Sequence, residues 1–182
     1  SGGSISRTSG SLAAGTGAGT FTFLGTGTVT GTVGFNNVNI AGGVNFGTSS
    51  TINGTLTINA SGFVSTNAPI YASGSTLKYN SGGTYGRGTE WSATSGAGYP
   101  HHVQISNGTT LDLGANNGTA TARQIAGNLT VDASSTLSMS VNPMMAALTV
   151  KGNYLNNGTT VLSSSVGGDL ILEGNLNDNA TF

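Results

Sequence analysis

The chain has 182 residues, and Gly, Thr, Ser and Asn fill 99 of them, whereas Lys and Arg number 5, Asp and Glu number 6, and the net charge is −1. With so few cations the chain cannot track nucleic-acid phosphates, and the absence of Cys excludes both disulfides and thiolate metal sites. Hydrophobic residues make up 36% of the chain in short, spaced runs, which argues against disorder, and no apolar run is long enough for membrane insertion.

Short strands are predicted along the whole chain from apolar triplets with a period of two. The triplets are, in chain order, residues 21–23, 38–40, 44–46, 56–58, 77–79, 103–105, 111–113, 129–131, 137–139, 148–150 and 170–172. In ten of the eleven the middle residue is polar, and only Ile171 breaks the pattern. Such alternation is typical of a half-buried strand, because successive side chains point to opposite faces. The sequence therefore predicts an all-β chain.

Two arrangements of these strands are open. Gly-, Asn- and Ser/Thr-rich turns separate them, so strand–helix–strand crossovers are not available. What remains is a right-handed parallel β-helix, or β-solenoid, and an antiparallel β-sandwich built from hairpins. Four Asn-Gly pairs, which suit two-residue hairpin turns, keep the sandwich as the alternative. They begin at Asn53, Asn107, Asn117 and Asn157.

Internal repeats favour the β-solenoid. Segments 127–131, 147–153 and 168–175 begin alike and start about 20 residues apart, and a second series at 110–113, 136–139 and 160–163 recurs about every 25 residues. A repeat of about 20 to 25 residues with two or three short strands corresponds to one coil. The whole chain, residues 1–182, is predicted to form one β-solenoid segment of a longer protein, with about seven to nine coils and a length of roughly 35 to 45 Å.

Residues 85–102 differ in composition from the rest of the chain and are predicted to form an excursion loop. They include the only Trp and both His residues. One interpretation is a binding surface for a glycan or a partner chain, because aromatic rings stack on sugars and dominate interface energetics. The candidate binding residues are Arg87, Glu90, Trp91, Tyr99 and His101. The other interpretation is that the loop covers an open edge or end of the core, with Trp91 buried and an Arg87–Glu90 ion pair worth under about 1 kcal/mol.

No metal site, cofactor or catalytic site is predicted. Adjacent His101 and His102 on an extended strand point to opposite faces, so they are not expected to share an ion. Hydrolysis or β-elimination of polysaccharides needs paired carboxylates or an acidic calcium site. The acidic residues are instead scattered at about one per coil, at Glu90, Asp112, Asp132, Asp169, Glu173 and Asp178. The sequence therefore predicts that the protein is not an enzyme.

Alternating Thr residues suggest one further alternative. Segments 20–22, 26–32 and 55–57 each contain Thr at every second position. Stacked on one face, they would form a flat array of hydroxyl and methyl groups like the surface of solenoidal ice-binding proteins. Thr is also the ordinary outward residue of a β-structure, so the pattern alone does not separate the two interpretations.

Residues 77–114 resemble part of a known class of protein. The sequence LKYNSGGTYGRGTEWSATSGAGYPHHVQIS at 77–106, followed by TTLDLG at 109–114, resembles a recurring segment of large secreted, repetitive β-helical surface proteins of Bacteroidetes. These adhesin-like proteins are usually exported by the type IX secretion system. The resemblance implies an extracellular location at the bacterial cell surface, and it supplies no active residues to carry over.

The function expected from these observations is structural and adhesive. The chain is predicted to form part of a cell-surface filament or adhesin, with cell-surface glycans or other protein subunits as partners. A glycan-binding module that uses the loop at 85–102 is the alternative. Because open solenoid ends are unpaired strand edges, end-to-end stacking into a homo-oligomer or filament is also expected.

Overall fold

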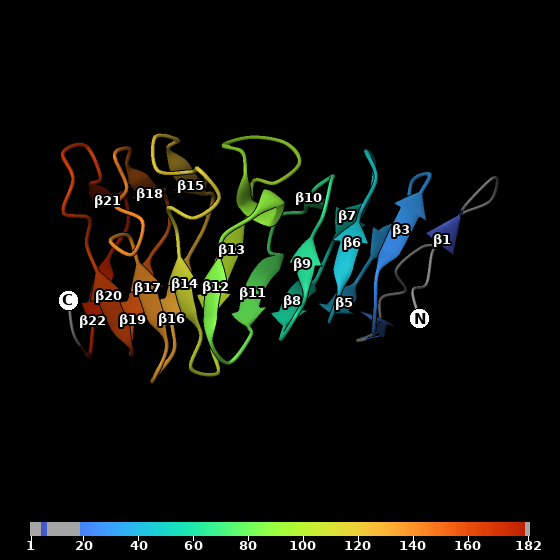
Figure 1. Cartoon of the computed structure of the whole chain (residues 1–182), viewed down its shortest axis with the longest axis horizontal. Coiled ribbons are helices and arrows are strands. Elements are labelled where there is room, and N and C mark those ends of the chain that lie inside the picture. Colours follow the sequence, from blue (N-terminus) through green and yellow to red (C-terminus); the bar gives the residue numbers. More distant parts are fainter. Residues whose placement is uncertain (1–4, 7–18, 181–182) are drawn as a thin grey trace.

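Parallel strands stack along one axis, as Figure 1 shows for the computed structural model, which describes residues 5–6 and 19–180. The longest sheet in this part of the chain has eight strands, and every neighbouring pair in it is parallel. Its strands are, in order, β2 (Thr20–Phe23), β5 (Asn37–Ile40), β8 (Thr55–Asn59), β11 (Thr76–Asn80), β13 (His102–Ile105), β16 (Leu129–Val131), β19 (Tyr154–Asn156) and β22 (Leu176–Asp178). The predicted parallel β-helix is confirmed, and the antiparallel sandwich is excluded.

Two further faces complete each winding. The second face carries β1 (Ile5–Ser6), β3 (Gly27–Thr30), β6 (Gly43–Asn45), β9 (Phe63–Val64), β12 (Thr84–Gly86), β14 (Thr110–Asp112), β17 (Thr136–Ser138) and β20 (Thr159–Val161). The third carries β4 (Gly34–Phe35), β7 (Thr51–Ile52), β10 (Ile70–Tyr71), β15 (Arg123–Ile125), β18 (Leu148–Val150) and β21 (Leu170–Leu172). The described residues thus make seven windings before β22, and six of these have a strand on all three faces. In the fourth winding the 3-10 helix η1 (Thr89–Trp91) and a loop replace the third strand.

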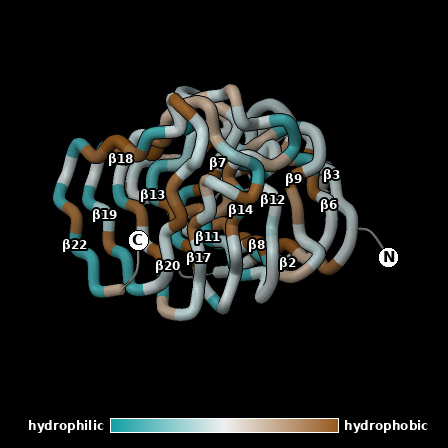
Figure 2. The backbone as a smooth tube through the Cα atoms, turned by 60° about the vertical axis from the view of Figure 1, so that its left-hand side comes forward, coloured by the Kyte–Doolittle hydropathy of each residue, from teal (hydrophilic) through white to brown (hydrophobic). Residues whose placement is uncertain are grey.

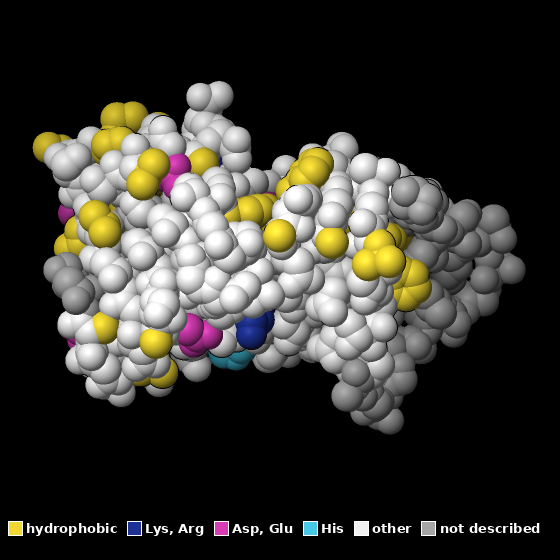
Figure 3. Space-filling model, turned by 60° about the horizontal axis from the view of Figure 1, so that its bottom comes forward, with side chains coloured by type: hydrophobic (Ala, Val, Ile, Leu, Met, Phe, Trp, Pro, Cys, Tyr) yellow, Lys and Arg dark blue, Asp and Glu magenta, His cyan; other side chains and the backbone are white. Residues whose placement is uncertain are grey.

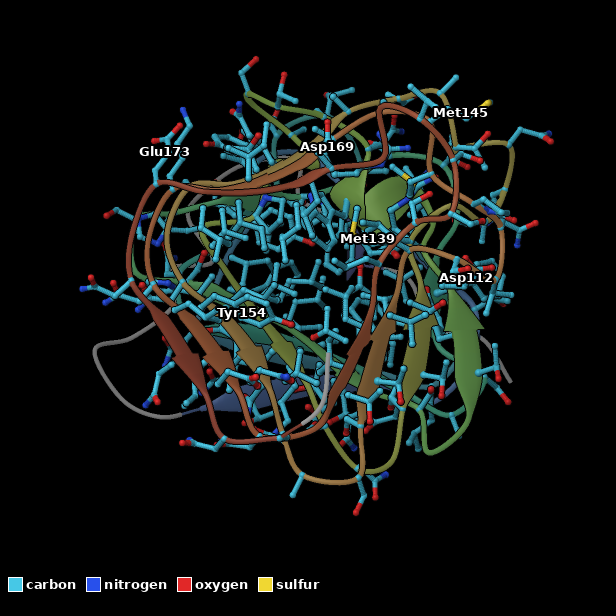
Figure 4. All side chains as sticks on the ribbon, turned by 90° about the vertical axis from the view of Figure 1, so that its left-hand side faces the viewer. Asp112, Met139, Met145, Tyr154, Asp169 and Glu173 are labelled. Carbon is cyan, nitrogen blue, oxygen red and sulfur yellow. The ribbon has the colours of Figure 1, made fainter. Side chains whose placement is uncertain are left out.

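The coil is right-handed, as expected from the general preference of parallel connections. Figure 4 looks along the axis from the C-terminal end. The last winding passes Asp169 at the top, then Glu173 at the upper left, and continues down the left side, so it turns anticlockwise as it approaches the viewer.

Among the described residues, no helix has the length and hydropathy needed to cross a membrane.

Inward side chains of the long sheet form columns, because the strand register is kept from one winding to the next. One column contains Phe21, Val38, Leu56, Leu77, Val103, Leu129, Tyr154 and Leu176. From Val38 to Tyr154 no member is more than 1% exposed. Figure 2 shows hydrophobic stretches recurring from winding to winding, and Figure 4 shows side chains filling the hollow of the coil. Each buried aliphatic side chain contributes about 1.5 to 3 kcal/mol to this stack.

The outward column of the same sheet is polar but mixed. It contains Thr22, Asn39, Thr57, Lys78, Gln104, Thr130, Leu155 and Asn177. Thr occupies only three of these eight described levels, so this column is not the regular Thr array that the ice-binding hypothesis requires. Figure 3 shows that charged side chains are few and scattered over one face of the molecule.

A ladder of side chains connects the windings just before the long sheet. Main-chain N–H groups donate to the side chain one winding below, from Asn128 to His102 Nδ1 at 2.8 Å, from Asn153 to Asn128 Oδ1 at 2.9 Å, and from Asn175 to Asn153 Oδ1 at 3.0 Å. The backbones approach closely here, and a Cβ at Gly152 would lie 2.6 Å from the carbonyl carbon of Gly127. Gly followed by Asn is therefore the local sequence signature of this corner.

The first repeat series noted in the sequence is only partly the one that stacks. Leu148 of β18 lies opposite Leu170 of β21, in agreement with the repeat. Leu129, however, belongs to the long sheet and lies opposite Tyr154, so it is on a different face from Leu148. The segment at 127–131 resembled the other two members of the series only because strands on two different faces have similar apolar triplets.

The second series contains a shift of one residue. Thr136 lies opposite Thr159, not opposite Thr160 as the sequence comparison suggested. Since a shift of one residue turns a side chain to the other face, Thr160 points inward and is buried, and Val161 is 40% exposed. The Thr160 hydroxyl is hydrogen-bonded to the hydroxyl of Tyr154 in the interior, which satisfies both polar groups.

Candidate functional site

The excursion loop lies on the third face and bridges two sheets. Leu77 pairs with Val103, which makes the fourth winding 26 residues long, whereas Phe21 pairs with Val38, only 17 residues away. On one side, Ala97 of the loop forms an antiparallel bridge with Ile70 of β10. On the other side the loop contacts β15. The loop thus fills the gap between β10 and β15 (Figure 1).

Trp91 anchors this loop inside the coil. Its side chain is fully buried, and its Nε1–H donates to the carbonyl of Gln124 in β15 at 2.9 Å. The buried ring offers no exposed face on which a sugar can stack. The structure therefore agrees with the alternative in which the loop covers the core, and Trp91 does not take part in a surface of the predicted kind.

Arg87 holds the loop to the next winding and is only 4% exposed. Its guanidinium donates to four main-chain carbonyls. Nε donates to the carbonyl of Leu113 at 3.0 Å, and Nη2 donates to that of Ala115 at 3.1 Å. Nη1 donates to two carbonyls, those of Gly88 at 2.8 Å and Trp91 at 3.0 Å. Arg87 thus bonds to backbone carbonyls and does not form the direct ion pair with Glu90 that was expected.

Glu90 is a buried acid held by hydrogen bonds. Its Oε1 accepts from the Gly88 N–H at 2.7 Å and from the Tyr79 hydroxyl at 3.1 Å, and its main-chain carbonyl accepts from the Tyr71 hydroxyl at 3.0 Å. Burial raises the pKa of Glu90, and the hydrogen bonds and the charge of Arg87 oppose this shift. Burial and the nearby Glu90 carboxyl also raise the pKa of Tyr79.

A second buried arginine, Arg123, lies beside Arg87. Arg123 is 3% exposed, and its Nε has no hydrogen-bond partner among the described residues. Its Nη1 has only a 3.5 Å contact with the carbonyl of Ala122. Burial, and then the charge of Arg87, lower the pKa of Arg123 to about 10.

Sequence reasoning missed Arg123, although a signal was present. In the register of the third face Arg123 aligns with Leu148 and Leu170, so a cation occupies a position that is apolar in the next two windings. The alternating pattern at residues 123–125, with Ile125 as its apolar member, would have identified an inward-facing Arg if the strand had been recognised.

A cavity of about 560 Å³ opens next to the two arginines. We call it the arginine cavity. It is lined by Phe63, Val64, Arg87, Gly88, Thr89, Glu90, Ser92, Asn116, Asn117, Gly118, Thr121 and Arg123. Its walls come from β9, the excursion loop and the loop at 116–121 of the fifth winding. Among the five predicted binding residues, only Arg87 and Glu90 line this cavity.

Tyr99 and His101 lie away from the arginine cavity and are half-buried. The ring of His101 contacts that of His102 edge-on, with centroids 4.4 Å apart. The expectation that these two rings diverge was therefore wrong, because His101 precedes the strand that begins at His102. Burial, followed by the charge of His101, lowers the pKa of His102. In the described part of the chain, no group of three or more His, Cys, Asp or Glu residues is placed to hold a metal ion.

Three other acidic side chains make hydrogen bonds within the solenoid. Asp112 accepts from the main-chain N–H of Gly114 at 3.2 Å and from both the main chain and the side chain of Asn142. Asp132 accepts from Gln104 Nε2 at 2.7 Å, and Asp178 from Asn156 Nδ2 at 2.8 Å. These carboxylates connect neighbouring windings.

Comparison of the chain with protein-family models, curated proteins and solved structures finds no match.

Proposed function

We propose that this chain is a section of an extracellular rod, a structural and adhesive β-solenoid that forms part of a bacterial cell-surface filament or adhesin and is not an enzyme. The observation that carries the proposal is the continuous register of the long sheet over eight described strands. Such a stack extends in one direction by adding equivalent windings, which suits a spacer that holds other parts of a protein away from a surface.

The composition of the outer surface supports an extracellular role. Outward positions are mainly hydroxyl and amide side chains, and charged residues make up 6% of the chain. Such a surface stays hydrated without charge and offers many weak hydrogen bonds to glycans or other subunits. The resemblance of residues 77–114 to repetitive surface proteins of Bacteroidetes points the same way, and with it we propose export by type IX secretion.

We also propose end-to-end association of copies of this chain, with β22 as the edge on which a further winding would stack. Leu176 of β22, the strand that follows the seventh winding, is 47% exposed. Leu176 continues the buried column below it, so a further winding stacked on β22 would bury it. Asn175 ends the corner ladder in the described residues, and by the pattern of Asn128 and Asn153 its side chain would accept a main-chain N–H from such a winding.

Sedimentation velocity and negative-stain electron microscopy of the purified chain test this proposal. We expect concentration-dependent association into rods of uniform width. Leu176→Lys should reduce association, because it places a charge on the stacking edge. Val141→Lys is the matched control, since Val141 is 59% exposed in the sixth winding. A chain that stays monomeric at high concentration, or equal association of both variants, would count against end-to-end stacking.

A further inference from the structure

We propose that the arginine cavity binds the acidic group of a saccharide, either the carboxylate of a uronic acid or a sulfate ester, with Arg123 as the residue that contacts the anion. This site shares Arg87 and Glu90 with the binding surface predicted from the sequence but contains none of its aromatic residues. It also does not depend on the rod function, because a winding can present the cavity whether or not copies of the chain associate.

Unused hydrogen-bonding capacity at Arg123 is the first argument. A buried cation without partners is costly, and proteins ordinarily pair such a group. Arg87 already donates to four carbonyls, whereas the buried Nε of Arg123 has no partner among the described residues. A guanidinium in this condition suits an oxyanion, which accepts two parallel N–H bonds.

The two guanidinium groups converge at one point of the cavity wall. A Cβ at Gly118 would lie 2.0 Å from Nη2 of Arg87 and 2.8 Å from Nη2 of Arg123. Only a residue without a side chain leaves room for both groups here. The approach of two like charges is unfavourable, and an anion held in the adjoining cavity would relieve it.

The charges that face the cavity favour an anion. Its described titratable lining groups are Arg87, Arg123 and Glu90. Glu90 is the only acid among them; its Oε1 is occupied by Gly88 and Tyr79, and its Oε2 has no hydrogen-bond partner among the described residues. With two arginines and one acid, the lining charge is positive on balance.

Size and lining favour a sugar over a bare ion. A volume of about 560 Å³ is within the range of small-molecule pockets and exceeds the needs of one oxyanion. The Asn116, Asn117 and Thr121 side chains line it and suit sugar hydroxyls. Phe63 is 48% exposed at the rim, and its ring lies over Gly43, where a Cβ would come within 2.6 Å of Cζ. Aromatic rings held in this way provide a stacking face for a pyranose.

Isothermal titration calorimetry of the purified chain with D-glucuronate, glucose 6-sulfate and neutral D-glucose tests the proposal. We expect one or both acidic sugars to bind and glucose not to bind. Tighter binding of D-glucuronate would identify a carboxylate as the preferred group, and tighter binding of glucose 6-sulfate would identify a sulfate ester. Arg123→Gln should weaken binding about tenfold to a hundredfold, the loss expected for charge-assisted hydrogen bonds. Phe63→Ala should weaken it about three- to tenfold.

Lys151→Gln is the control, because it removes a cation from an exposed position outside the cavity, and it should leave affinity unchanged. Circular dichroism and thermal melting establish that each variant is folded. If Arg123→Gln does not fold, the exposed Phe63→Ala variant decides. Binding of glucose as tight as that of the acidic sugars, or unchanged affinity in a folded Arg123→Gln variant, would overturn the proposal. Equally tight binding of inorganic sulfate or L-glutamate would overturn the assignment of a saccharide.

Discussion

The long sheet and the excursion loop fill the interior of the coil in different ways. In the long sheet, aliphatic side chains such as Leu56 and Leu77 stack on the same position of the neighbouring winding, and the register alone places them. In the loop, Trp91, Arg87 and Glu90 are just as deeply buried, but each is held by individual hydrogen bonds. A regular stack therefore tolerates similar side chains along a column, whereas the loop depends on particular polar partners.

The largest expected effect comes from Trp91→Ala. This substitution removes a fully buried ring and its hydrogen bond to Gln124, so we expect the free energy of unfolding to fall by about 3 to 5 kcal/mol. Leu77→Ala, in the regular column, should cost about 2 to 5 kcal/mol. Urea denaturation followed by circular dichroism measures both. A loss below about 0.5 kcal/mol for Trp91→Ala would mean that the loop is a surface attachment and not part of the core.

Glu90 is expected to make the stability of the chain depend on pH. The regular column of the long sheet contains no acidic residue that could have the same effect. Burial raises the pKa of Glu90 in the folded chain above the ordinary 4.5. At pH values between 4.5 and this raised pKa, Glu90 is protonated in the folded chain and ionised in the unfolded chain. Stability therefore falls as pH rises through this interval and is greatest below it. Glu90→Gln retains an oxygen acceptor for Gly88 and Tyr79 but cannot ionise. The stability of the wild type relative to Glu90→Gln should decrease as pH rises above 4.5.

Urea denaturation at a series of pH values measures that difference. Asp169→Asn is the matched control, since it removes a carboxyl group from an exposed position outside the loop. A wild type and a Glu90→Gln variant with parallel pH profiles would show that the carboxyl titrates normally and that the polar interior of the loop is open to water.

The smallest effect is expected in the corner ladder. Asn128→Ala removes the acceptor for the main-chain N–H of Asn153, and because water can reach this site the loss of stability should be about 0.5 to 1 kcal/mol. Asn177→Ala, at an exposed outward position of β22, should have almost no effect. Thermal melting of the two variants separates them; equal melting temperatures would show that the ladder follows the stacking and does not strengthen it.

Local alternation predicted 11 of the 22 described strands, because a period of two sets which side chains point inward. It was not enough to predict register where two faces have similar triplets, as for Leu129 and Leu148, or where Thr and Val compete for an inward position, as for Thr160 and Val161. The candidate site was harder still. The unusual composition at 85–102 marked this segment, whose ends lie in β12 and β13 so that the segment between the strands is 87–101. Nothing in an aperiodic segment indicates whether Trp91 points inward. The cavity depends on Arg123, which lies 32 residues beyond Trp91 in the chain and meets the loop only through winding.

The unequal lengths of the windings have a mechanical consequence. Hydrogen bonds between windings run along the axis of the rod, so tension on its two ends acts directly to peel one winding from the next. At about 3.4 Å per extended residue, release of the winding from Leu77 to Val103 would add roughly 90 Å of contour length, and release of that from Phe21 to Val38 only roughly 60 Å. Under load the rod would therefore lengthen in graded steps, and the size of each step would identify the layer that had opened.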